Sequence, residues 1–172
     1  MAEHPTQPEM LADLYESQQA LLTFLDQVDD TTLYRRFIAE EWTLAENLVH
    51  VAEARQFFTG EVRKVLATPG ASIGRGLDHP ARLQNIAEHG HAARPFISQQ
   101  LTNSYEQVVH LLEQMSQDDL QKMGTHIKYG PQTLAVFIQH FIIEHDQAHV
   151  KQVKTLLAQH RGGACTSEQQ NS

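Results

Sequence analysis

The apolar residues of this chain recur at three- and four-residue intervals along most of its length, and this spacing is the strongest constraint on its fold. Such spacing places apolar side chains on one face of an α-helix. Alternation with a period of two, which is typical of strands, is nearly absent. Four long segments carry the helical pattern, and we expect helices over about 8–28, 43–68, 95–115 and 131–160. The chain is therefore expected to be all-α.

The residues at the ends of these segments support their limits. Thr43-Leu44-Ala45-Glu46 matches a capping box, in which the first and last side chains each accept the other's free backbone N–H. The glycine pair Gly162-Gly163 is expected to end the fourth helix. The segments 67–94 and 116–130 form two long connections, which permit crossovers. We expect a four-helix bundle with long crossover-type connections.

The length of 172 residues favours one domain with its own core. We expect a single bundle domain over 1–161, followed by a disordered polar tail over 162–172. No apolar run approaches the roughly 20 residues that span a bilayer, so we expect no membrane association. The first ten residues lack the basic and apolar regions of a secretion signal, so we expect a cytoplasmic protein.

The net charge is strongly negative. There are 13 Lys and Arg residues against 21 Asp and Glu residues, which gives −8 with histidine neutral. Nucleic-acid binding draws on cationic groups that neutralise phosphates. From this balance we expect no nucleic-acid partner.

Histidine is over-represented, with 11 residues, and two of them fall on an apolar stripe. His145 and His149 continue the inward face of the fourth expected helix, and residues four apart overlap within one turn. His50, in the middle of the second expected helix, is the best candidate for a third ligand. The three imidazoles could bind one divalent metal ion. The alternative is a set of hydrogen-bonded histidines in the core.

The remaining histidines are expected to lie on the surface, in loops or at the border of the core. His140 is five residues before His145, about 140° around an ideal helix, so we expect it outside the site. Glu46, one turn before His50, is the residue that we consider as a base. The eight histidines assigned to surface, loop or border positions are His4, His79, His89, His91, His110, His126, His140 and His160.

Two segments resemble a known family. EWTLAENLVH, which ends at His50, resembles its pattern of a tryptophan before the second helix and a histidine about eight residues later. EHDQAHVKQV, which contains His145 and His149, resembles its terminal H-x-x-x-H-x-x-Q-[IV] pattern. Together they resemble the DinB-like (DinB/YfiT) superfamily. The resemblance implies a four-helix bundle that binds zinc or nickel through these three histidines and commonly forms homodimers.

The resemblance also implies a class of function. Some relatives are metal-dependent transferases that use low-molecular-weight thiols such as bacillithiol or mycothiol, and others are hydrolases or isomerases. We therefore expect a metal-dependent enzyme, a thiol-dependent S-transferase or a hydrolase, that acts on a small-molecule substrate. The alternatives are a non-catalytic bundle with a structural or sensing metal, a partner-binding role, and a bundle without metal. The sequence does not assign a catalytic residue.

Overall fold

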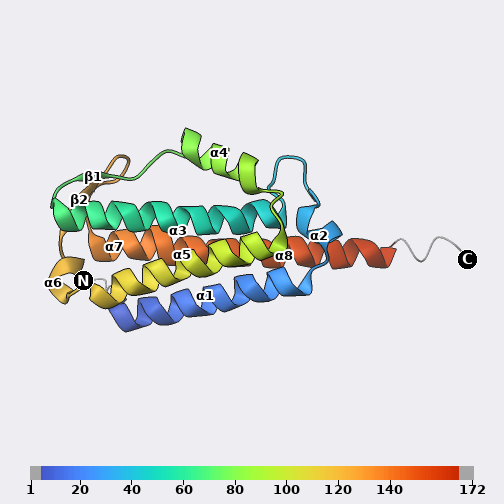
Figure 1. Ribbon diagram of the computed structural model, residues 1–172, viewed down its shortest axis with the longest axis horizontal. Coiled ribbons are helices and arrows are strands. Elements are labelled where there is room, and N and C mark those ends of the chain that lie inside the picture. The colour runs from blue at the N-terminus through green and yellow to red at the C-terminus, as the bar shows by residue number, and fades with distance from the viewer. Residues whose placement is uncertain (1–4, 167–172) are drawn as a thin grey trace, which may run out of the picture.

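The computed structural model describes residues 5–166, and of these 160–166 by their backbone alone. Four long helical segments form a bundle, which confirms the predicted fold class (Figure 1). The segments are α1 (Gln7–Gln27), α3 (Leu44–Ala67), α5 (Arg94–Gln114) and a continuous fourth helix made of α7 (Leu134–Ile138), the π-helical turn η1 (Gln139–Ile143) and α8 (Glu144–Thr166).

The order of the helices around the bundle differs from a simple up-and-down arrangement. Helix α3 packs against α5 and α8, and α1 packs against the same two helices, so α1 and α3 occupy opposite corners. Figure 1 shows that α3 and α5 run in the same direction. The chain therefore returns along the bundle between them, through β1 (Ser72–Ile73) and α4 (Pro80–His89). The short α2 (Asp30–Tyr34) lies between α1 and α3 in the sequence.

The second long connection stays at one end of the bundle (Figure 1). It contains α6 (Gln117–Leu120), β2 (Met123–His126) and β3 (Gly130–Thr133). β2 pairs antiparallel with β3 and parallel with β1, which gives the sheet order β1-β2-β3. The periodicity did not predict these strands because each has only two to four residues. The sheet ties the start of the crossover to the end of the bundle.

A polar layer divides the bundle core into two apolar clusters. One cluster contains Met10, Leu14 and Val108, and the other contains Leu21 and Ile97. Between them along the helices lie the buried polar side chains Ser17, Gln18, Arg55, Ser104 and Asp146. A buried polar group is costly unless it is hydrogen-bonded. This layer can therefore form only where its donors and acceptors meet.

Arg55 of α3 bonds to all three other bundle helices from the centre of this layer. Its Nε donates to Asp146 Oδ2 on α8 at 2.7 Å, and both side chains are 0% exposed. Its Nη1 donates to Gln18 Oε1 on α1 at 2.7 Å and to the Leu101 carbonyl on α5 at 3.2 Å. A shift of any one helix would break a bond to a buried charge, so the layer fixes the register of the bundle.

The C-terminal end of the fourth helix differs from the expectation. Helix α8 continues to Thr166, beyond the glycine pair at 162–163 where we expected it to end. Residues 167–172 of the predicted tail lie outside the described residues. Within the described part of the chain, no helix combines the length and the apolar character that crossing a membrane requires.

We predict that Asp146→Ala lowers the free energy of unfolding by about 3–5 kcal/mol, because it leaves the Arg55 charge buried without a counterion. Urea unfolding followed by circular dichroism measures the change. The double variant Arg55→Met, Asp146→Leu should lose much less, because no uncompensated charge remains. Asp26→Ala, at an exposed position of α1, is the control and should stay within about 0.5 kcal/mol of the parent. A loss below about 1 kcal/mol for Asp146→Ala would contradict this role.

Candidate metal centre

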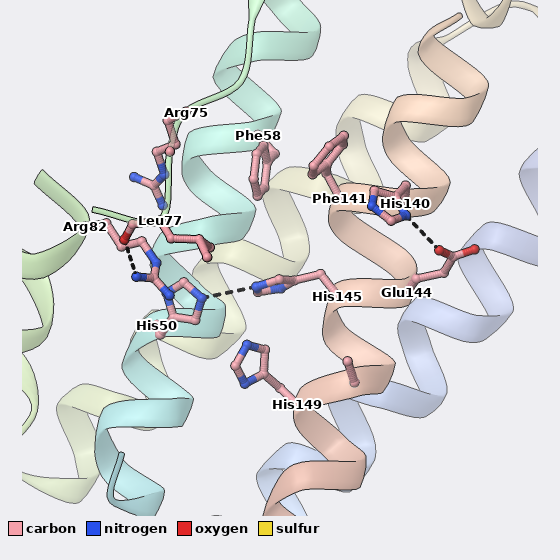
Figure 2. A pocket seen from close by; sticks show the side chains of 12 residues that line it. His50, Phe58, Arg75, Leu77, Arg82, His140, Phe141, Glu144, His145 and His149 are labelled. Carbon is pink, nitrogen blue, oxygen red and sulfur yellow. Dashed lines mark hydrogen bonds and ion pairs between the residues drawn. The ribbon is translucent and has the colours of Figure 1, made fainter. Parts of the chain in front are cut away.

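Three histidines from two helices converge beside the polar layer. His50 comes from α3, and His145 and His149 come from successive turns of α8 (Figure 2). The Nε2 atoms of His50 and His145 are 3.1 Å apart, and one ring nitrogen from each of the three residues lies within 4.8 Å of the others. Nitrogens bound tetrahedrally to one zinc ion at 2.0–2.1 Å lie about 3.3 Å apart. The cluster therefore needs only small movements to hold a divalent ion.

A buried amide sets the tautomer of His149. Asn47 Oδ1 lies 3.0 Å from His149 Nδ1. The Asn47 Nδ2 donates to the carbonyls of Thr43 at 2.9 Å and Trp42 at 3.4 Å, so its oxygen faces the imidazole. His149 Nδ1 must then carry the proton and donate it to Asn47. The Nε2 lone pair is left for a metal, and a hydrogen bond of this kind orients most metal-binding histidines.

Burial keeps two of the imidazoles neutral. Burial, together with the neighbouring His145, lowers the pKa of His50 from 6.5 to about 2 and that of His149 from 6.5 to about 3. His50 also packs against the edge of Trp42, with ring centroids 4.8 Å apart, and its Nδ1 has no hydrogen-bond partner among the described residues. Metal ions bind the neutral form of histidine. The environment therefore stabilises the form that a metal needs.

The three histidines line a cavity of about 530 Å³. This volume is within the usual range for sites that bind small molecules. Figure 2 shows the three imidazoles together on one side, with aromatic side chains and two arginines around them. The lining residues are His50, Phe58, Arg75, Gly76, Leu77, Arg82, His140, Phe141, Glu144, His145, Ala148 and His149. An ion at the histidines would be reachable from this cavity.

The π-helical turn η1 changes which residues face the cavity. We expected His140 to lie away from the site, because five residues span about 140° of an α-helix. A π-turn closes an i→i+5 ring, so residues five apart lie about one turn apart. Because η1 covers 139–143, His140 and His145 line the same cavity. His140 is not a member of the histidine cluster, and its Nδ1 pairs with Glu144 Oε2 at 3.0 Å.

Two other expected positions also differ in the structure. Glu46, considered as a base, does not line the cavity, because its carboxylate accepts from the Thr43 backbone at 2.8 Å and binds Arg36 at 2.7 and 2.8 Å. His126, expected in a connector, is buried on β2 and stacks on Phe141 with ring centroids 4.6 Å apart. The side chains of residues 4 and 160 lie outside the described residues.

Sequence reasoning missed several residues of the site. Asn47 lies one turn before His50 on the same helix, and that spacing was an available signal. Asp146 was harder to identify from the sequence, because only the structure shows that it is buried and paired with Arg55 rather than solvated. Arg82 lies in a loop-rich segment whose path the sequence does not define.

Comparison with known proteins establishes the family. Residues 13–153 match the DinB superfamily, and the chain belongs to this superfamily. A sequence comparison with curated proteins finds no significant match.

Solved structures share the fold over most of this chain. YfiT from Bacillus subtilis, described as a probable metal-dependent hydrolase with an unusual four-helix bundle topology, has a TM-score of 0.76 and 15% identity over 92% of this chain and 91% of its own. The mycothiol-dependent maleylpyruvate isomerase has a TM-score of 0.71 and 13% identity over 85% of this chain and 60% of its own. At sequence identities this low, the structural similarity shows that this chain shares the fold of these proteins and nothing more.

A third structure corrects an expectation about partners. The colibactin self-resistance protein ClbS, solved in complex with dsDNA, has a TM-score of 0.68 and 13% identity over 88% of this chain and 95% of its own. The expectation that net charge excludes a nucleic-acid partner is therefore wrong for this fold. Net charge describes the whole chain, whereas nucleic-acid binding depends on the local distribution of charge.

We predict that Asn47→Leu lowers the zinc affinity about 10- to 100-fold, because His149 loses the acceptor that fixes its tautomer. Competition with a chromophoric chelator measures the affinity, and circular dichroism checks the fold. Asn47→Asp keeps the acceptor oxygen and should retain the affinity within about threefold. Asn103→Leu, at an exposed position of α5, is the control. Equal affinities for Asn47→Leu and the parent would show that Asn47 does not support the site.

Proposed function

We propose that this DinB-superfamily protein is a metal-dependent enzyme in which His50, His145 and His149 bind one divalent ion, zinc or nickel. The observation that carries the proposal is the convergence of three imidazoles beside an open cavity, with two of them held neutral by burial. Catalytic zinc sites commonly use three protein ligands and keep a position for a water or substrate.

Neutral ligands leave the full charge of the ion available to a substrate. A divalent ion supplies Lewis acidity, which lowers the pKa of a water or thiol bound to it. The chain's own residues would orient and surround it. Asn47 holds the tautomer of His149, and Phe58 and Phe141 form an apolar part of the cavity wall. Among the cavity residues outside the proposed ligand set, His140 and Glu144 form a pair of the residue types used in general acid–base catalysis, with 3.0 Å between His140 Nδ1 and Glu144 Oε2.

The reaction that we propose is an attack by a thiol or water on an electrophilic small molecule. This makes the protein a thiol-dependent S-transferase or a hydrolase. The open cavity supports both, because either nucleophile fits beside the histidines. Neighbours with this fold are described as a probable metal-dependent hydrolase and as a mycothiol-dependent isomerase, and these descriptions support a choice between water and a thiol.

A structural or sensing metal is the second candidate. Structural zinc sites are almost always closed by four protein ligands. The described part of the chain offers a cluster of three histidines, one of them beside a carboxylate: His50 Nδ1 lies 3.9 Å from Glu53 Oε2. That carboxylate is held by Arg75 at 2.5 Å. The donor set therefore favours an open site over a closed one.

We predict that the protein, purified without a polyhistidine tag, contains about one divalent ion per chain. His145→Ala together with His149→Ala should reduce this to below about 0.1, because one histidine remains of the proposed three. Elemental analysis by mass spectrometry measures both. His89→Ala together with His91→Ala removes two histidines outside the cluster and is the matched control.

Two results would contradict the proposal. Retention of stoichiometric metal by the His145→Ala, His149→Ala variant would place the ion elsewhere. A melting temperature that falls by tens of degrees on chelation, together with spectroscopic evidence for four protein ligands, would indicate a structural metal.

A further inference from the structure

The wall of the cavity contains a cation, Arg82, that forms no ion pair within the described part of the chain. Arg82 lies in the first turn of α4, and its guanidinium carbon is 4.7 Å from the centroid of the Trp42 ring. Its Nη1 donates to the Leu77 carbonyl at 2.6 Å. Among the described residues no carboxylate forms an ion pair with it. Its Nε and Nη2 groups are therefore available to a ligand.

The other charged side chains of the cavity each have a described partner. Arg75 forms two bonds with Glu53, both 2.5 Å long. Glu144 on α8 pairs with His140 at 3.0 Å. Arg82 is thus the arginine of this cavity that forms no ion pair with a described side chain, because Glu53, the carboxylate whose charge acts on it, is bound to Arg75. Partial burial of an unpaired charge costs free energy, and an anion at this position would recover it.

Arg82 lies close to the histidine cluster. Figure 2 shows its guanidinium beside His50, on the side of the cavity that Leu77 borders. Phe58 and Phe141 form an apolar wall of the same cavity. A ligand bound to Arg82 can therefore reach the histidines and contact an apolar surface at the same time.

We infer that Arg82 is a specificity-determining residue that binds an anionic oxygen group, a carboxylate or a phosphate, of a small molecule whose apolar part lies against Phe58 and Phe141. The planar guanidinium presents parallel N–H donors that match both groups. The inference rests on the proposed function, because the anion anchors a substrate whose reacting atom lies at the histidines. It names the substrate class: small organic anions with an apolar body.

The chain contains its own reporter for this test. Trp42 is the single tryptophan, and Arg82 lies over its ring. Binding of an anion to Arg82 should change the fluorescence of Trp42. The probes are phenylacetate, its uncharged isostere phenylacetamide, and phenylphosphonate, each titrated into the full chain both with zinc and after removal of metal. Comparison of the two acids distinguishes a carboxylate from a phosphate as the preferred group.

We expect at least one of the two anions to bind about tenfold more tightly than phenylacetamide, the ratio typical of a hydrogen bond to a charged group. Arg82→Gln should remove this preference and leave the affinity for phenylacetamide within about twofold. Arg82→Lys should retain part of it, because the charge remains and the planar donor pair is lost. Arg63→Gln removes the same charge at an exposed position of α3, about 20 Å along the helix from His50, and should change nothing.

The metal-free titration separates this inference from the proposed function. If the metal-free protein prefers the anion over the amide and Arg82→Gln loses this preference, the inference is supported even if the chain binds no metal. A preference seen only with zinc supports it if Arg82→Gln removes that preference. The inference is overturned if Arg82→Gln and the parent show the same ratio of affinities in both forms, or if neither anion binds better than the amide.

Discussion

The buried charge of Arg55 is the constraint on which the arrangement of this bundle depends. A guanidinium with no access to water must meet acceptors, and here they come from α1, α5 and α8. Its partner Asp146 directly follows His145 in the chain, so the ion pair that fixes α8 against α3 also brings His145 opposite His50. The apolar clusters on either side bury hydrophobic surface, and the polar layer between them fixes how the helices align along the bundle axis.

The helical part of the fold could be predicted from the sequence. Leu14, Leu21 and Leu25 lie at helical spacing and are all buried, as the periodicity required. The direction of α5 could not be predicted, because the length of a connection permits a crossover without requiring one. The sheet was missed because a strand of two residues such as Ser72–Ile73 is too short to show a period of two. The π-turn η1 was missed because its i→i+5 hydrogen bonds require no particular residue types.

The proposed ligand set could be predicted because helical spacing places His145 and His149 on one face, and because His50 lies in the middle of the second expected helix, at a position that the family resemblance also matches. The cavity around them could not be predicted in this way. Arg82 and Leu77 come from the crossover, and their position depends on how that segment lies over the bundle. In this structure the bundle helices supply the three histidines, and the crossover supplies Arg75 and Arg82 to the wall of the cavity.

The proposed function requires that three histidines hold a divalent ion and leave a position open to the cavity. X-ray absorption spectroscopy on the zinc-reconstituted protein tests it most directly, because it reports the number and type of atoms bound to the ion. We expect four nitrogen or oxygen atoms bound to the ion at about 2.0–2.1 Å, with the outer-shell scattering of about three imidazoles. A first shell with sulfur at about 2.3 Å, or one without imidazole scattering, would contradict it.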